Sequence, residues 1–312
     1  MALSGRVGGI PKAELDRFDQ YSSFPTINTM RISLTSALAV TTADVSSVAA
    51  PYLTPLSNAA TGYGLITLWD GGRWKVFRTR EITAQTTTAA GLATDTNYDL
   101  FAYSDLGTRD QVYLIHGPAW SSATARALSL EEKDGVFVWP GIPERLYIGT
   151  LRTYTSLGDT YFRDTASNRY VWNAFNRKAR RMSAIDATNT WAYTIATWRQ
   201  ANATASNRVE YVVGLSEEPV RASVGVFAFQ SGGADSAVGV GVDSTTVNSA
   251  QTYGWANSTQ GAPQLAEYQG WPGIGYHALN WLEISAATGT TTWRGDNGVS
   301  YVQSGMVAEV MA

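Results

Sequence analysis

The sequence contains no cysteine and only two histidines among its 312 residues. The absence of cysteine excludes disulfide frameworks, thiolate nucleophiles and thiolate zinc sites. Because imidazole and thiolate ligands are scarce, we expect neither a transition-metal site nor a cofactor. A protein that is made in a reducing cytoplasm and works outside the cell must be stable without disulfides, and this composition suits that requirement.

Charged residues are also scarce, at 16% of the chain, and 23 Lys+Arg against 26 Asp+Glu give a formal net charge of -3. We therefore expect no nucleic-acid partner, because no strong positive field would attract one. The densest basic run, Arg177–Arg181, is interpreted as a solvated edge or as a source of inter-subunit ion pairs. No apolar run approaches the ~20 residues that span a bilayer, and no secretory signal is recognisable, so we expect no membrane insertion.

Aromatic residues and glycine are abundant instead. The chain has 11 Trp, 16 Tyr, 9 Phe and 29 Gly, and 44% of its residues are hydrophobic. Aromatic and β-branched side chains favour a pleated surface, while glycine supplies turns and bulges. The composition and the many short apolar–polar alternations predict an all-β fold with two antiparallel β domains, sandwich or jelly-roll like, and a short N-terminal arm.

The predicted arm covers residues 1–30, the first β domain 31–182 and the second 183–312. Within the arm, Pro11–Tyr21 could form a short helix with Pro11 in its first turn. An arm of this kind cannot bury a core alone, so it is either a docking segment or a frayed tail. The residues predicted to dock it are Ile10, Leu15, Phe18 and Tyr21.

Turn signals punctuate the first β domain. Asp70-Gly71-Gly72 separates Gly64–Trp69 from Arg73–Phe77, which predicts a hairpin, because Asp-Gly tolerates the positive φ of tight turns. Ala119–Glu132 has no strand pattern and could hold one helical turn or an irregular excursion. Further predicted strands include Asn97–Tyr103, Asp134–Val138, Arg145–Thr153 and Arg169–Arg177.

The order of these segments, together with Trp69-Asp70-Gly71 and Trp74–Phe77, resembles a module of tailed-bacteriophage structural proteins. Those proteins are of the tail-fibre, spike or head-decoration kind. The resemblance covers roughly residues 30–182 and, weakly, Trp293–Ala312. It implies a non-enzymatic virion protein that is assembled in the host cytoplasm, functions extracellularly, contacts other tail, fibre or capsid proteins and forms a homo-oligomer, in particular a homotrimer.

Catalytic residues are not predicted. His116 and His277 have no Gly-x-Ser-x-Gly nucleophile elbow beside them, and a histidine on a strand is usually packed and hydrogen-bonded. Two carboxylates could hydrolyse a glycan, one as acid and one as base, but no spacing selects a pair. The acids considered are Asp134, Asp159, Asp164, Glu267 and Glu283.

A cluster of aromatic residues in the second domain suggests either packing or sugar binding. Rings stack on the apolar faces of sugars while amides and charges bond the hydroxyls, although tyrosine and tryptophan are equally typical of cores and interfaces. We favour packing for the cluster as a whole and expect Tyr276 and Trp281 in the core. The candidate carbohydrate-binding residues are Trp255, Trp271, Trp293, Arg294, Asn257 and Tyr268.

The sequence therefore predicts a tail-fibre or spike component that docks on the particle and presents a β domain for host adhesion, with surface polysaccharide as the expected receptor. Two alternatives stay open. One is a capsid decoration or head-spike base without a receptor role, and the other is a glycan-degrading tailspike enzyme.

Overall fold

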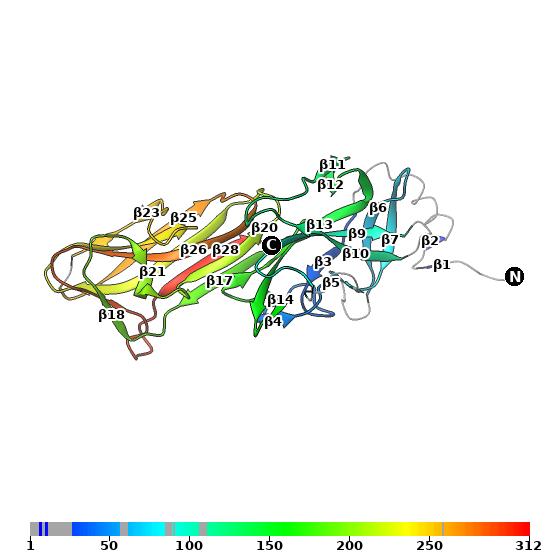
Figure 1. The fold of residues 1–312 in the computed structure, drawn as a ribbon. Helices are drawn as coiled ribbons and strands as arrows, with labels where there is room; N and C mark the ends of the chain where they lie inside the picture. Colours follow the sequence, from blue (N-terminus) through cyan, green and yellow to red (C-terminus); the bar gives the residue numbers. More distant parts are fainter. Residues whose placement is uncertain are drawn as a thin grey trace. The chain divides into compact units, whose positions relative to one another are not determined.

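The protein is all-β. The computed structural model describes residues 6–7, 10–11, 27–56, 62–84, 89, 91–105, 111–257 and 259–312. Within these residues the chain forms 28 strands and one 3-10 turn, η1 (Ala201–Ala203), and no α-helix (Figure 1). Most strand pairs are antiparallel; β15 (Asn168–Arg169) and β20 (Arg208–Val213) are parallel. The predicted fold class is confirmed.

The chain divides into two compact units. The first comprises Met1–Ser122, Arg126–Phe162 and Asn173–Asn176, and the second Ala123–Ala125, Arg163–Trp172 and Arg177–Ala312. The chain passes between them in β14 (Asp159–Asp164) and β16 (Val171–Asn173). Met182, near which the sequence places a boundary, lies inside β17 (Ala179–Ile185), and this strand pairs along its whole length with β28 (Gly305–Met311).

The N-terminal segment begins with two very short strands. β1 (Arg6–Val7) pairs with β2 (Ile10–Pro11), and Pro11 lies opposite Arg6. Pro11 is thus in a strand and not in the first turn of a helix, because the fixed φ of proline suits a strand end as well as a helix start. Residues 12–21 lie outside the described residues, and with them Leu15, Phe18 and Tyr21; Ile10 lies in β2.

The predicted hairpin is present in the first unit. β6 (Gly64–Trp69) pairs with β7 (Trp74–Thr79), so that Trp69 and Trp74 face each other. The amide of Asp70 donates to the carbonyl of Arg73 at 2.9 Å. Gly71 has a φ of 69°, which glycine adopts without a steric penalty. The confirmed turn explains why Asp-Gly follows the first strand.

The predicted central strands of this unit also form. β9 (Asn97–Ser104) lies between β10 (Val112–Ala119) and β13 (Ile142–Ser156). The first six residues of β9 are all buried, so this strand is covered on both faces and loses its alternation. The other strands of the unit are β3 (Met30–Ser33), β4 (Val45–Val48), β5 (Tyr52–Pro55), β8 (Ile82–Thr83), β11 (Glu131–Lys133) and β12 (Val136–Trp139).

The Ala119–Glu132 segment is an irregular excursion held by a buried ion pair. Arg126 Nε lies 2.7 Å from Asp99 Oδ2, and its guanidinium lies 4.6 Å from the centroid of the Trp120 ring. The Thr150 hydroxyl also donates to Asp99, at 2.7 Å. Burial nevertheless raises the pKa of Asp99 above its usual range. The paired charges fix a segment that has no regular backbone ladder.

The second unit is a two-sheet sandwich. One sheet has the order β17-β28-β21-β25-β23, and β18 pairs with β27, which pairs with β21. The other contains β15, β20, β26, β22 and β24 in that order, with β19 paired to β26. The new strands are β18 (Thr190–Tyr193), β19 (Arg199–Gln200), β21 (Val220–Gln230), β22 (Ser236–Val242), β23 (Thr252–Tyr253), β24 (Trp255–Ala256), β25 (Ala262–Gly270), β26 (Gly275–Ser285) and β27 (Thr291–Arg294).

Polar and aromatic side chains tie the two sheets together. Gln264 of β25 donates to the hydroxyl of Ser236 on β22 at 2.8 Å, in a buried position. The Trp191 and Trp281 rings meet edge to face with centroids 5.8 Å apart, which joins β18 to β26. Trp281 is fully buried, as the sequence predicts for a strand residue of this kind.

A buried carboxylate organises the second sheet of this unit. Glu210 accepts hydrogen bonds from the Tyr170 hydroxyl (2.5 Å), the Tyr276 hydroxyl (2.7 Å) and the Asn168 amide (2.6 Å). Arg208 Nη2 lies 2.6 Å from Glu210 Oε1, the oxygen that also accepts from Tyr276. Burial works to raise the pKa of Glu210, but these donors prevail and lower it below the usual value. The ionised carboxylate therefore stabilises the fold.

Candidate functional site

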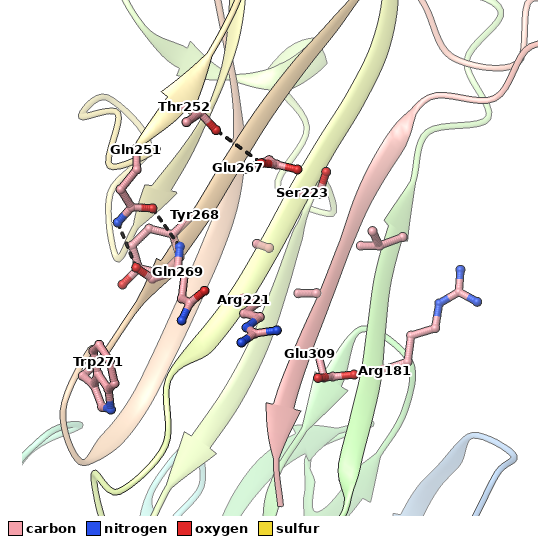
Figure 2. Close-up of a pocket in the computed structure, with 13 residues that line it drawn as sticks. Arg181, Arg221, Ser223, Gln251, Thr252, Glu267, Tyr268, Gln269, Trp271 and Glu309 are labelled. Atoms are coloured by element: carbon pink, nitrogen blue, oxygen red, sulfur yellow. Dashed lines mark hydrogen bonds between the residues drawn. The ribbon is translucent and has the colours of Figure 1, made fainter.

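A groove of the described residues lies on the outer face of the β17-β28-β21-β25-β23 sheet and has a volume of about 780 Å³. It is open to solvent and lies wholly within the second unit. Figure 2 shows its side chains projecting from neighbouring strands. Its lining residues are Arg181, Arg221, Ala222, Ser223, Gln251, Thr252, Glu267, Tyr268, Gln269, Trp271, Val307, Ala308 and Glu309.

Strand register sets the first row of groove side chains. Glu309 of β28 lies opposite Arg181 of β17 on one side and Arg221 of β21 on the other. Arg221 in turn lies opposite Gln269 of β25. All four side chains are exposed, because successive strand residues point to opposite faces and the alternate positions fill the core. The row therefore presents cation, anion, cation and amide in that order.

These four side chains are available to a ligand. Within the described part of the chain, the two guanidinium groups and the Glu309 carboxylate make no ion pair within 4.0 Å, and none of the four side chains makes a hydrogen bond to protein. Arg181 serves the fold through its backbone only, since its carbonyl accepts from Arg169.

A second row runs beside the first. Ser223 of β21 lies opposite Val307 of β28 and Glu267 of β25, and Glu267 lies opposite Thr252 of β23. The Thr252 hydroxyl donates to Glu267 Oε2 at 3.3 Å. This row adds two hydroxyls and a second carboxylate to the groove floor.

The edge of the groove is fixed by one glutamine. Gln251 Oε1 accepts from the backbone N–H of Gln269 at 2.8 Å, and Gln251 Nε2 donates to the backbone carbonyl of Gln269 at 2.9 Å. Figure 2 shows both hydrogen bonds as dashed lines. The side-chain amide thus takes the place of a strand beside β25. This clamp holds the backbone that carries Gln269 and leads to Trp271.

Aromatic rings border this end of the groove. Trp271 follows β25 and is 59% exposed, so more than half of its surface is open to solvent. Tyr268 contributes to the wall but is largely buried, and burial together with the charge of Asp243 raises its pKa. Gly270 permits this arrangement, because a Cβ there would lie 2.3 Å from the Tyr268 hydroxyl.

The structure separates the predicted carbohydrate-binding residues. Trp271 and Tyr268 line the groove. Trp255 is 64% exposed on β24, and Asn257 is exposed after it, but neither lines the groove. The prediction for Trp293 is wrong: it lies in β27, pairs with Trp191 and is fully buried, so neither ring face can reach a sugar.

Arg294 belongs to the same strand as Trp293. It is half-buried, and its guanidinium lies 5.2 Å from the Phe227 ring centroid. It is not among the residues that line the groove. The turn that follows β27 begins only after Arg294, so Trp293 and Arg294 both lie in the strand.

Several groove residues were not predicted. Arg221, Glu309 and Gln269 lie at alternating exposed positions of their strands, which is the signal that could have marked them. Their meeting depends on β28 inserting between β17 and β21, and no local pattern shows this. Arg181 was noted only as part of a basic run, whose Arg177 and Arg180 pair with acids of the same unit.

The candidate catalytic groups have other contacts. His277 is buried with Nδ1 2.7 Å from Asp243 Oδ2, and its Nε2 has no hydrogen-bond partner among the described residues. His116 is half-buried in β10, its Nδ1 2.7 Å from the carbonyl of Gly117. No nucleophile of the described chain therefore bonds His277 Nε2.

The acids considered for glycan cleavage are dispersed. Asp134 accepts from the Trp74 indole at 2.8 Å, and Asp164 pairs with Arg169 and Arg180. Glu283 is fully buried beside Trp191 and Arg199, and burial raises its pKa. Asp159 is exposed at the start of β14, and of the five only Glu267 lines the groove.

The described residues contain neither a metal-ligand cluster nor a membrane-spanning helix. No three of their His, Cys, Asp or Glu side chains are grouped so that they could hold a metal ion. None of their helical segments has the length and apolar character needed to cross a bilayer.

The fold and the groove together define an all-β protein with a solvent-open groove on one sheet face. No protein-family model and no curated protein matches the chain. Among solved structures, a β-porphyranase of glycoside hydrolase family 86 from Bacteroides plebeius is similar at 10% identity and a TM-score of 0.24, covering 93% of this chain and 37% of that one.

Two other solved structures show weak likeness. The insecticidal δ-endotoxin Cry8Ea1 from Bacillus thuringiensis is 9% identical with a TM-score of 0.25, covering 99% of this chain and 58% of that one. The infectious bursal disease virus Gx strain structure is 9% identical with a TM-score of 0.18, covering 93% and 77%. This chain thus spans 37% and 58% of the first two proteins' lengths.

Proposed function

We propose that this chain is a non-enzymatic structural and adhesion component of a bacteriophage or phage-like particle, and that its second unit binds host surface polysaccharide in the groove. The observation that carries the adhesion role is the combination of an exposed Trp271 ring with a row of unpaired polar side chains on one rigid sheet. Sugars are bound by this chemistry, since a ring covers their C–H face while fixed groups bond their hydroxyls.

The virion assignment rests on the sequence resemblance of residues 30–182 to phage structural modules. We propose a tail-fibre or spike component, with residues 1–30 as the docking arm. Deletion of residues 1–24 is expected to prevent incorporation into particles while the circular dichroism of the β fold is retained. Normal incorporation of this truncated chain would remove the docking role.

The adhesion role is tested by retention of surface polysaccharide on immobilised protein. Trp271→Ala is expected to weaken retention at least tenfold, as for an aromatic anchor residue of an interface. Trp255→Ala is the matched control, because Trp255 is equally exposed but lies outside the groove. Equal losses in both variants, or no loss in either, would contradict the groove as the binding site.

A glycan-degrading enzyme is the second candidate, because Glu267 and Glu309 both line the groove. Their strands flank β21, and their register differs by two residues. This spacing puts their Cα atoms about 12 Å apart. Two glutamate side chains can bridge that distance to the roughly 6.5–9.5 Å between the carboxyl groups of inverting glycosidases, so the assay for cleavage decides between the two candidates. Released reducing ends that disappear in Glu267→Gln would establish the enzyme instead.

A homotrimer is proposed as the assembled form. The same sheet face carries exposed apolar side chains at Ile185, Leu265 and Val307, of which Val307 also lines the groove. Such surface is typical of contacts between subunits. Light scattering is expected to give three times the chain mass of 33.7 kDa. A single-chain mass at micromolar concentration would contradict the trimer.

A further inference from the structure

The first row of the groove alternates hydrogen-bond donors and acceptors. The Arg181 and Arg221 guanidinium groups only donate, and the Glu309 carboxylate between them only accepts. Gln269 next to Arg221 does both. None of these side chains is satisfied by another described residue within hydrogen-bond or ion-pair distance. A ligand on this row must therefore supply both kinds of partner at neighbouring positions.

From this row we infer that the groove selects an uncharged polysaccharide and binds it across the strands, from Arg181 towards Trp271; the inference rests on the proposed function. A hydroxyl group donates and accepts, so a run of sugar hydroxyls satisfies arginine, glutamate and glutamine together. Hydrogen bonds to the charged members are stronger than neutral ones. The sugar at the end of the bound polysaccharide segment then stacks on the Trp271 ring.

An acidic polysaccharide fits this row poorly. A carboxylate or sulfate that spans Arg181 and Arg221 would meet the Glu309 carboxylate between them, and like charges repel at such distances. The groove as a whole also has no excess of either sign, because Glu267 and Glu309 balance the two arginines. Charge thus disfavours an anionic ligand both locally and over the whole lining.

The direction of the ligand follows from the sheet. Arg181, Glu309, Arg221 and Gln269 lie on β17, β28, β21 and β25, which are consecutive strands. At about 4.8 Å per strand the row is about 14 Å long. Trp271 lies beyond the end of β25 at the Gln269 side (Figure 2). This length accommodates an oligosaccharide. A monosaccharide would leave some of the four side chains without a hydrogen-bond partner.

The test uses the full chain and bacterial surface polysaccharides that anion exchange has separated into an uncharged and an acidic pool. Retention of each pool is measured on wild type, Glu309→Gln and the control Glu132→Gln, whose glutamate is exposed in the first unit. Retention is also compared between about 0.05 M and 0.5 M salt, because screening weakens only charge-driven binding.

The expected result is retention of the uncharged pool with little dependence on salt. Glu309→Gln should weaken it about fivefold, since a neutral acceptor replaces a charged one, and Glu132→Gln should not change it. Retention of the acidic pool alone, lost in high salt and strengthened by Glu309→Gln, would overturn the inference and leave the proposed function standing. Retention of neither pool would overturn both.

Discussion

Replacing Glu210 by glutamine tests whether the ionised carboxylate stabilises the second unit. Glu210 Oε2 accepts from Tyr170 and Asn168, and Oε1 accepts from Tyr276 and forms an ion pair with Arg208. In the glutamine variant an NH₂ group replaces one of the two carboxylate oxygens. Whichever oxygen is replaced, two of the neighbouring donor groups then face a donor instead of an acceptor. The loss of two such bonds in a buried site is expected to cost about 4 kcal/mol of unfolding free energy.

The assay is thermal and urea unfolding of the purified chain at several pH values. A loss of about 4 kcal/mol should lower Tm by roughly 8–16 °C for a unit of this size. Because the pKa of Glu210 is below its usual value in the folded state, the stabilisation is fully present above the unfolded pKa of about 4.3. It is lost as the pH falls through the lower folded pKa, so the difference between wild type and variant should shrink there.

Glu309→Gln is the matched control, because Glu309 is exposed in the same unit. It should change stability by less than about 0.5 kcal/mol at every pH. A Glu210→Gln protein as stable as wild type at neutral pH would refute the reasoning. So would a difference that does not shrink at acid pH, because the cost would then come from shape and not from charge.

Two further substitutions test other features of the second unit. Trp293→Ala should cost about 3–5 kcal/mol by leaving a cavity, while polysaccharide retention by the folded fraction is preserved; a stable variant that no longer binds would restore Trp293 as a sugar contact. Gly275→Ala should cost about 2 kcal/mol or more in urea unfolding. Its φ is 108° and a Cβ would lie 2.3 Å from the Ala123 carbonyl oxygen, so unchanged stability would contradict that close approach.

Local pattern was sufficient for much of the fold. The Asp70-Gly71 turn and the alternation of β21 and β25 depend on residues that are neighbours in sequence, so both were predictable. The pairing of β17 with β28 joins residues more than a hundred positions apart, and no local signal specifies it. This pairing also assembles the first row of the groove, so the row was missed although its residues are ordinary exposed strand positions.

Residue type was a weaker guide than burial for the candidate site. Trp271 and Trp293 both lie near turns in the sequence, but Trp293 pairs with Trp191 inside the sandwich and Trp271 does not enter a strand. The chemistry of tryptophan suits both places equally. Only the tertiary partners of each ring distinguish a core position from a ligand contact.

The central place of β28 affects how the second unit can form during translation. β17 and β21 have no direct pairing with each other in this sheet; each pairs with β28, which is synthesised long after both. The nascent chain therefore leaves one edge of each strand unpaired until residues 305–311 have left the ribosome. Chains interrupted before that point would expose these edges to one another, and premature termination should yield aggregates instead of a smaller folded product.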